Sequence, residues 1–177
     1  MKKSAPVHTL MIVGLGNPGK KYASTYHNVG QQFLHFLLDD TKFSENQPFF
    51  KAQKMHLGEQ TVILLEPKTF MNESGGAIAS ALNYFRLPVS SLLIVHDDFD
   101  LPLGEFRLSQ NRGSAGHRGV DSIITTLKTK AFLRARIGVR SSSEKAMDLV
   151  LRPVRAKDKK MIQGVFAVLR EKVIVKV

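Results

Sequence analysis

Three histidines and one aspartate stand where a predicted segment ends, which is where side chains from different segments can meet. The histidines are His27, His96 and His117, and Asp97 lies at the end of the apolar run SLLIVHDD. A carboxylate that binds one ring nitrogen of histidine fixes the tautomer and makes the other nitrogen a better base. Such a pair can take a proton from water and contributes about 10²–10⁴-fold to a rate. These residue types therefore indicate hydrolysis by activated water, and they leave open which histidine is the base.

Two asparagines lie close to the same predicted segment ends. Asn17 follows the first apolar run, and Asn72 lies a little beyond the second. A carboxamide can donate to a carbonyl oxygen and accept from an amide N–H, which suits both an oxyanion and a peptide backbone. Asparagine is equally common in turns, so for either residue alone a purely structural role fits as well.

Other hydrolytic chemistries lack their characteristic patterns in this sequence. There is no H-E-x-x-H pair for a zinc helix, no G-x-S-x-G turn for a serine nucleophile and no cysteine. We therefore expect neither a metal site nor a covalent nucleophile. His8, His35 and His56 occur in contexts that indicate no function, and we interpret them as surface or hydrogen-bonded core residues.

The glycine-rich stretch VGLGNPGKKYASTYHN matches two phosphate-binding patterns. Gly14, Gly16 and Gly19 satisfy the dinucleotide pattern G-x-G-x-x-G, and Gly14, Gly19 and Lys20 satisfy most of a P-loop. A nucleotide-binding enzyme is therefore one hypothesis for this chain.

The residues around these glycines argue against nucleotide binding. Pro18 stiffens the turn, and the helical period starts only near Asn28, whereas a dinucleotide site needs a helix directly after the third glycine. The acids about 20 residues on, Asp39 and Asp40, lie at the end of a predicted helix. The acid that binds the ribose in a dinucleotide site lies at the end of a strand. A P-loop needs Ser or Thr where this chain has Lys21. We interpret the glycines as shaping a tight turn.

The elements that must position these residues follow from apolar periodicity. Short apolar runs predict strands buried on both faces: Thr9–Gly16, Thr61–Pro67, Ser91–Asp98 and Arg134–Arg140. Apolar residues recur at helical spacing in four segments: Val29, Phe33, Phe36 and Leu37; Ile78, Leu82 and Phe85; Val120, Ile123, Ile124 and Leu127; and Met161, Ile162, Val165, Phe166 and Leu169. The polar segments 108–119 and 140–146 are expected to be loops.

Alternating strands and helices predict an α/β protein. We expect one domain over residues 1–177, with a mixed, mostly parallel sheet flanked by helices on both sides, a phosphorylase/hydrolase-like arrangement. In open α/β sheets the site lies outside the carboxyl ends of the strands, where Asn17, Asn72 and Asp97 are expected.

The composition points to a basic protein that binds nucleic acid. The 177 residues include 26 Lys and Arg against 15 Asp and Glu, a formal net charge of +11, which makes nucleic acid the leading class of partner. We find no apolar run of about 20 residues and no targeting segment, so we expect no membrane association. The lack of cysteine fits a cytoplasmic location best.

Five motifs, in their order and spacing, closely resemble the bacterial peptidyl-tRNA hydrolase family. They are IVGLGNPGKKYASTYHNVG, EPKTFMNESG, VHDDFDLPLG, GSAGHRG and RARIGV, and together they span residues 11–139. The segment LVLRPV is similar to the family's late passage from strand to helix. The resemblance implies a monomeric α/β enzyme that hydrolyses the ester between a peptide and the 3′ ribose of tRNA, without metal or other cofactor.

The resemblance also implies roles for individual residues. His27 is expected to be the general base for the attacking water, with Asp97 as the carboxylate that orients it. Asn17 is expected to polarise the ester carbonyl, and Asn72 to bind the peptide and the 3′ end of the tRNA with it.

The remaining implied contacts surround this centre. Met71 is expected at the floor of the pocket and Tyr22 at its wall. His117 falls on a mobile loop beside the cleft, and Arg136 on a basic position that meets phosphate of the tRNA acceptor stem.

The chain departs from the family pattern at a few positions. Arg118, which we expect at the substrate, replaces the asparagine of the motif GGHNG, and a guanidinium can donate but cannot accept a hydrogen bond. Tyr26 replaces an arginine, Ser109 replaces a basic residue, and RSSS replaces a glycine-Arg-Pro turn. The alternative hypothesis is therefore a non-catalytic RNA-binding relative, like the chloroplast intron-splicing factors of this fold.

Overall fold

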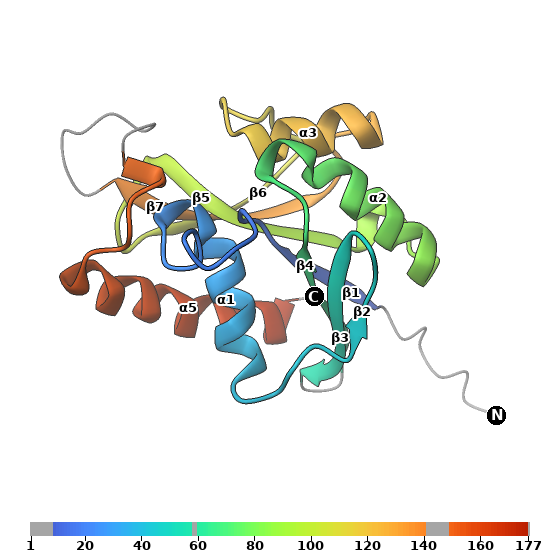
Figure 1. Cartoon of the computed structure of the whole chain (residues 1–177), viewed down its shortest axis with the longest axis horizontal. Helices are drawn as coiled ribbons and strands as arrows, with labels where there is room; N and C mark the ends of the chain where they lie inside the picture. The colour runs from blue at the N-terminus through green and yellow to red at the C-terminus, as the bar shows by residue number, and fades with distance from the viewer. Residues whose placement is uncertain (1–8, 58–59, 141–148, 177) are drawn as a thin grey trace.

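A seven-stranded mixed sheet in the order β2-β3-β4-β1-β5-β7-β6 forms the centre of the fold (Figure 1). The computed structural model describes residues 9–57, 60–140 and 149–176. Four central strands run parallel: β4 (Gln60–Pro67), β1 (Leu10–Gly14), β5 (Leu92–Pro102) and β7 (Leu133–Arg140). All four apolar runs that predict strands therefore form the parallel core.

Three further strands lie towards the edges and pair antiparallel with their neighbours. β3 (Phe50–Leu57) pairs with β4, β2 (Glu45–Asn46) pairs with β3, and β6 (Phe106–Gln110) pairs with β7. None was expected from the sequence, because strands that expose side chains to solvent carry no continuous apolar run.

The two predicted loops have different outcomes. The expectation of a loop over residues 108–119 is wrong at both ends, because residues 108–110 belong to β6 and pair with β7, and residues 118–119 belong to α3. In the other predicted loop, residues 140–146, Arg140 ends β7 and the remainder lies outside the described residues.

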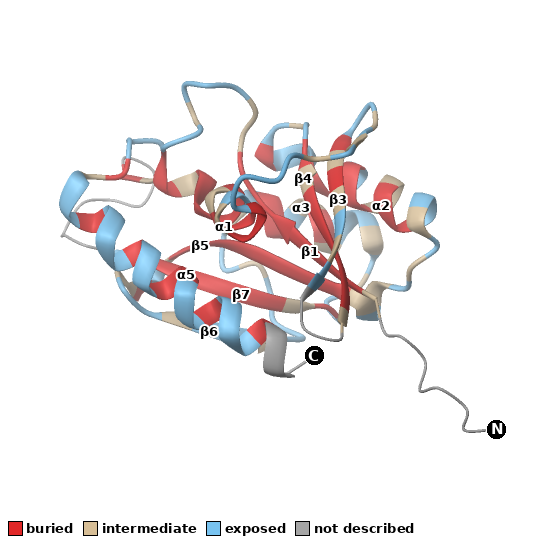
Figure 2. Cartoon of the chain, turned by 90° about the horizontal axis from the view of Figure 1, so that it is seen from below, coloured by how far each residue is buried: buried red, intermediate tan, exposed pale blue. Residues whose placement is uncertain are grey.

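In the part of the chain that the structure describes, four helices cover the two faces of the sheet, as their apolar periods predict. α1 (Val29–Leu38) and α5 (Ala156–Lys176) pack on one face, and α2 (Ser74–Phe85) and α3 (Arg118–Leu127) pack on the other. Figure 2 shows buried residues along the central strands and on the inward sides of the helices. The predicted α/β class with a mixed sheet between two helical layers is confirmed. No helix in the described part of the chain is long and apolar enough to cross a membrane.

The two cores are divided by alternate residues of the same strand. Leu10 and Ile12 of β1 pack with α1 and α5, while Met11 and Val13 pack with α2 and α3. Successive side chains of a strand point to opposite faces, and burial of each aliphatic side chain stabilises the fold by about 1.5–3 kcal/mol. The carboxyl ends of the central strands, where the polar residues lie, are therefore held by packing on both faces of the sheet.

The glycines after β1 serve packing and turning. A Cβ atom on Gly14 would lie 2.3 Å from the carbonyl oxygen of Gly30, because the start of α1 lies directly against the end of β1. Gly19 has a φ of +101°, a left-handed conformation that favours glycine. These positions support the interpretation of the stretch as a tight turn.

Candidate active site

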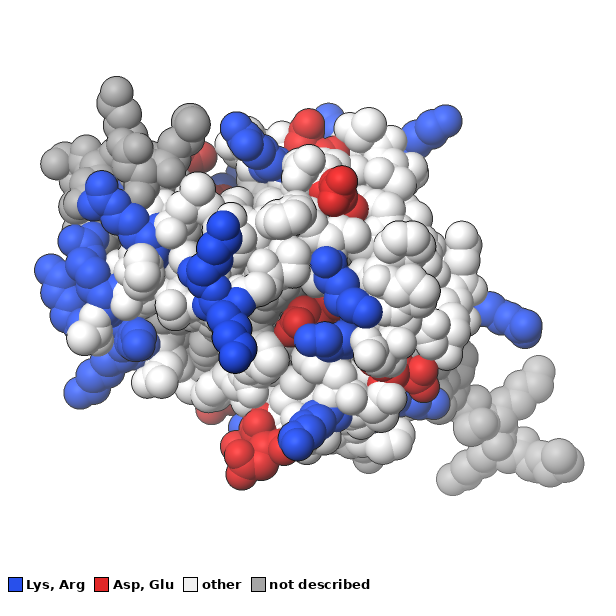
Figure 3. Space-filling view, viewed as in Figure 1, with Lys and Arg blue, Asp and Glu red and all other residues white. Residues whose placement is uncertain are grey.

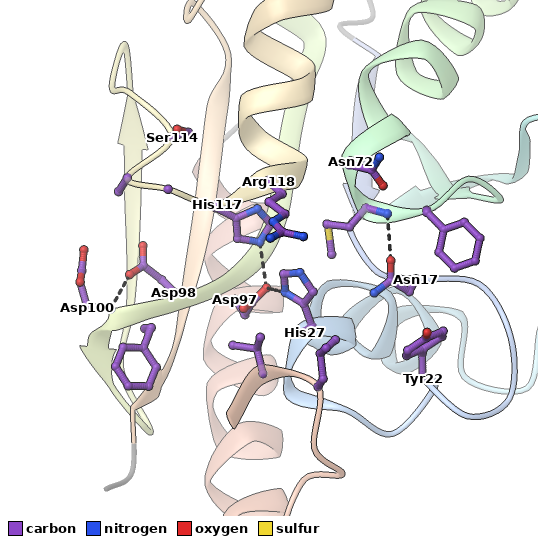
Figure 4. A pocket seen from close by; sticks show the side chains of 17 residues that line it. Asn17, Tyr22, His27, Asn72, Asp97, Asp98, Asp100, Ser114, His117 and Arg118 are labelled. Atoms are coloured by element: carbon purple, nitrogen blue, oxygen red, sulfur yellow. Dashed lines mark hydrogen bonds and ion pairs between the residues drawn. The ribbon is translucent and has the colours of Figure 1, made fainter. Parts of the chain in front are cut away.

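A cavity of about 580 Å³ lies at the carboxyl ends of the parallel strands. Of the nine residues expected to act in the site, eight line it: Asn17, Tyr22, His27, Met71, Asn72, Asp97, His117 and Arg118. Figure 4 shows that they come from the segment after β1, the segment after β4, the end of β5 and the start of α3. Four stretches far apart in the sequence thus meet around one cavity.

His27 and Asp97 form the centre of the site. Nδ1 of His27 lies 2.8 Å from Oδ1 of Asp97, and both side chains are largely buried. An ionised carboxylate can only accept, so Nδ1 of His27 carries the hydrogen and Nε2 has a free lone pair. Burial of the ring lowers the pKa of His27, but the charge and hydrogen bond of Asp97 outweigh it, so the pKa lies above its usual value. This raised pKa makes His27 a stronger base than a free imidazole.

His117 donates to the same carboxylate oxygen. Its Nδ1 accepts a hydrogen bond from the backbone N–H of Val120 at 3.3 Å, because His117 is the N-cap of α3. The hydrogen therefore sits on Nε2, which lies 2.9 Å from Oδ1 of Asp97. Burial raises the pKa of Asp97, but His117 and then His27 outweigh it and hold that pKa well below its usual range. Asp97 is therefore a buried, ionised carboxylate that receives two imidazole donors.

His96 lies next to the site but is turned away from the cavity. Its Nδ1 lies 2.6 Å from the carbonyl oxygen of Asp97, and its ring centre lies 4.6 Å from that of His117. Burial and the neighbouring His117 lower the pKa of His96 well below its usual value, so the ring is neutral. Among the three histidines at segment ends, His27 and His117 bind the Asp97 carboxylate, and His96 packs against the ring of His117.

Asn17 is oriented by the segment after β4. Its Oδ1 accepts a hydrogen bond from the backbone N–H of Met71 at 2.9 Å, as the dashed line in Figure 4 shows. With Oδ1 engaged in this way, Nδ2 of Asn17 remains as a donor for a ligand in the cavity. The structure thus leaves Asn17 its donor function and commits its acceptor to the protein.

Asn28 holds the backbone of Asn17, and the sequence analysis missed it. Its Oδ1 accepts from the backbone N–H of Asn17 at 2.9 Å, and its Nδ2 donates to the carbonyl oxygen of Asn17 at 2.8 Å and to Oε1 of Gln31 at 2.9 Å. Asn28 is fully buried and Gln31 nearly so. The available signal was Gln31, a polar residue on the buried side of an apolar helix.

Arg118 lines the cavity, and Figure 4 shows its side chain beside His117 and His27. It makes no hydrogen bond or ion pair with any residue that the structure describes. Its charge lowers the pKa of His27, against the larger effect of Asp97. The replacement of the family's asparagine therefore places a positive charge inside the site.

Aromatic side chains form the wall opposite the two histidines. The rings of Tyr22 and Phe70 pack edge to face with their centres 6.5 Å apart, and both residues line the cavity. Phe70 is half exposed, and the sequence analysis did not select it. Val150 and Leu151, from the segment LVLRPV, close the cavity on the side of α5.

Arg136 lies outside the lining of this cavity. Its Nε donates to Oδ2 of Asp98 at 2.6 Å, and both side chains are largely buried between β5 and β7. The phosphate contact expected for Arg136 stays a prediction. The structure adds that the guanidinium of Arg136 is bound by Asp98 within the protein.

His27, Asp97 and His117 could together offer ligands to a metal ion, since their ligand atoms lie within 4.8 Å of one another. Both histidine nitrogens, however, lie at hydrogen-bond distance from the same carboxylate oxygen. The two imidazole N–H groups donate to the Asp97 carboxylate, and the carboxylate accepts both. The hydrogen bonds of these three side chains are therefore satisfied without an ion. The absence of a metal requirement stays a prediction.

Comparison of the sequence with known proteins gives one family. The family model described as peptidyl-tRNA hydrolase matches residues 11–176. A peptidyl-tRNA hydrolase of Lactobacillus gasseri is 38% identical over 161 residues, which is 89% of this chain and 87% of the relative. One of Syntrophomonas wolfei is 39% identical over 155 residues, or 86% of this chain and 85% of the relative.

The fold is similar to solved structures of proteins with the same name. A crystal structure of peptidyl-tRNA hydrolase from Acinetobacter baumannii has a TM-score of 0.85 and 30% sequence identity, and it covers 97% of this chain and 89% of its own. A peptidyl-tRNA hydrolase in complex with N-propanol has a TM-score of 0.87 and 30% identity, covering 98% and 90%. Because the family model matches nearly the whole chain and the named relatives are 38–39% identical over most of their length, this chain belongs to the peptidyl-tRNA hydrolase family.

Proposed function

We propose that this enzyme hydrolyses the ester between a peptide, or an N-acylated amino acid, and the 3′ ribose of tRNA, with His27 as the general base. The observation that carries the proposal is the hydrogen bond from Nδ1 of His27 to Asp97, which leaves Nε2 unprotonated beside the cavity. A base in this state can remove a proton from water at neutral pH. Asp97 fixes the tautomer and the ring orientation, and His117 in turn fixes Asp97.

The reaction follows from these positions. Water attacks the ester carbonyl carbon while Nε2 of His27 takes its proton, and a tetrahedral oxyanion forms. Nδ2 of Asn17 is the donor available to this oxyanion, because its Oδ1 is bound by Met71. The bond from carbon to the ribose oxygen then breaks, and protonated His27 returns the proton to the leaving tRNA oxygen. The products are a free carboxylic acid and tRNA with its 3′ hydroxyl restored.

The other lining residues are assigned to substrate binding. We assign Asn72, Tyr22 and Met71 to the peptide and the 3′-terminal nucleotide, because all three line the cavity and Figure 4 shows Asn72 and Tyr22 on the side away from Asp97. Arg118 makes no bond with a described residue and can donate to the ester carbonyl or to a backbone phosphate. Its positive charge suits either group, because the ester oxygen becomes negative in the transition state and a phosphate is negative throughout.

We also propose that the enzyme acts as a monomer in the cytoplasm, without a metal ion or nucleotide cofactor. The closed hydrogen-bond arrangement of His27, Asp97 and His117 supports the metal-free mechanism. The basic composition supports tRNA, through its acceptor stem and 3′ end, as the partner. A non-catalytic RNA-binding role is not favoured, because the base and its carboxylate are in place and the named relatives are hydrolases.

The test is release of the N-acylated amino acid from an acyl-aminoacyl-tRNA by the purified protein and by its His27→Ala variant. We expect robust turnover by the first and a loss of at least about a hundredfold in the second, the low end of general-base contributions. Binding of deacylated tRNA by both proteins is the control for folding. Equal and negligible turnover by the two proteins, with tRNA binding intact, would favour the RNA-binding alternative.

A further inference from the structure

The segment that leads into α5 carries a concentration of positive charge. It comprises Arg152, Arg155, Lys157, Lys159 and Lys160, which we call the basic start of α5. The single acid among them, Asp158, is buried and bound by Tyr26 and Arg155, so it offers no charge to the surface. Figure 3 shows Lys and Arg side chains gathered at the edge of the molecule where α5 begins in Figure 1.

This charge lies where a helix tolerates it poorly. The N-terminus of a helix carries a partial positive charge, so acidic residues are favoured there and cations are unfavourable. In α5 the exposed residues Lys157, Lys159 and Lys160 all lie near the N-terminus. A local feature that opposes helix stability is expected where a function compensates for it. Asp158, the acid of this first turn, is bound by Arg155, so an anionic ligand would be the partner that compensates the exposed lysines.

The basic start of α5 is continuous with the active-site cavity. Val150 and Leu151 line the cavity, and Arg152 follows directly in the chain. The chain therefore leads from the rim of the cavity at Leu151 directly into α5, so a ligand larger than the cavity has this basic surface on its way out. Lys157 and Lys160 lie one helical turn apart, which places their side chains next to each other on the exposed side of the helix.

The basic start of α5 is also fixed relative to the proposed base. The backbone N–H of Tyr26 donates to the carbonyl oxygen of Arg152 at 3.2 Å, and the N–H of Val154 donates to that of Ser24 at 2.8 Å. The buried hydroxyl of Tyr26 donates to Asp158 within α5. Because Tyr26 immediately precedes His27, a ligand held by this surface is held in a set position relative to His27.

We propose that the basic start of α5, through Lys157 and Lys160, binds the sugar-phosphate backbone of the tRNA body while the 3′ end occupies the cavity. The proposal rests on the proposed function, which places an acylated tRNA end beside His27. A nucleic-acid backbone supplies negative charges in regular succession, and lysines that neutralise phosphates contribute affinity without reading sequence. The surface thus contributes to binding the whole tRNA and leaves the chemistry at the ester unchanged.

The test is the double variant Lys157→Glu/Lys160→Glu. Its matched control is Lys42→Glu/Lys54→Glu, which makes the same change in net charge at exposed positions on the loop after α1 and on β3. Glutamate near a helix N-terminus is favourable, so the α5 variant is expected to fold, which a thermal unfolding curve checks. Three ligands are compared: deacylated tRNA, N-acyl-aminoacyl-tRNA, and the 3′-terminal CCA trinucleotide carrying the same acyl group.

We expect the α5 variant to weaken Kd for deacylated tRNA and to raise KM for the full substrate, each by roughly tenfold at low salt. The slope of log Kd against log salt concentration should become shallower by about two phosphate contacts. With the acylated trinucleotide, kcat and KM should equal those of the parent protein, because that substrate does not reach α5.

Two results would overturn the proposal: an unchanged Kd for tRNA, or equal losses in the α5 variant and the control variant. An increase in KM that is as large for the trinucleotide as for the whole tRNA would also contradict it. If the parent protein hydrolyses neither substrate, the proposed function fails, and the Kd measurements still decide whether this surface binds tRNA.

Discussion

The side chain of Asn28 binds both backbone polar groups of Asn17, accepting from its N–H at 2.9 Å and donating to its carbonyl oxygen at 2.8 Å. This pair of bonds fixes the turn after β1 that presents the Asn17 side chain to the cavity. The position of the proposed oxyanion donor therefore depends on a buried residue that does not touch the substrate.

We expect Asn28→Ala to lower kcat with a smaller effect on KM, because Asn17 loses its fixed position. The change leaves buried backbone groups unpaired and should reduce the free energy of unfolding by about 1–3 kcal/mol. Steady-state kinetics and urea unfolding measure the two effects. The control is Asn83→Ala on the exposed side of α2, which should change neither. An Asn28→Ala variant with parent kcat would show that the turn holds Asn17 without this clamp.

Arg118 should shift the pH dependence of the reaction, which Asp97 affects more strongly. The pKa of His27 is raised overall, and the base works only when unprotonated, so the rate should fall as pH drops through that pKa. Arg118 lowers the pKa of His27, so Arg118→Asn should raise it further and move the acidic limb of the rate profile to higher pH. Arg118→Lys keeps the charge and should leave the limb near its original position. A limb that moves to lower pH in Arg118→Asn would contradict this electrostatic role.

Arg136 and Arg107 face each other in register across β7 and β6, but only the first is buried. Arg136→Ala leaves Asp98 without its partner, and breaking a buried ion pair in this way costs about 3–5 kcal/mol in unfolding free energy. If its terminal nitrogens reach phosphate as predicted, the salt dependence of tRNA binding should also flatten by about one contact. Chemical unfolding and tRNA titrations at several salt concentrations test both. Arg107→Ala is the comparison for stability, where we expect no loss, and an unchanged salt slope in Arg136→Ala would remove Arg136 from the tRNA footprint.

The metal-free mechanism predicts that dialysis against a strong chelator leaves turnover unchanged. His27 and His117 each donate a hydrogen bond to Asp97, and a cation between them would have to displace both protons. Turnover is measured before and after chelation, and again after addition of Zn²⁺ or Mg²⁺. A loss of turnover on chelation that one of these ions restores would contradict the mechanism.

The sequence by itself determined the central strands and the helices of this fold. The strands β1, β4, β5 and β7 are buried on both faces, so their residues form continuous apolar runs that can be recognised in the sequence. The sequence also determined that polar site residues lie at the carboxyl ends of the strands. Asn17 follows one apolar run, Asp97 lies at the end of another, and the strands are parallel. The sequence motifs around these residues were sufficient to identify the family.

Only the tertiary structure decided which polar groups meet and in what protonation state. That His27 and His117 share one oxygen of Asp97 depends on contacts across 70 and 20 residues of sequence, which no local pattern specifies. The same holds for the antiparallel strands β3 and β6, because their hydrogen bonds come from neighbouring strands and their exposed side chains need not be apolar. Local physics fixes what a segment becomes, whereas the packing of segments fixes which side chains can react together.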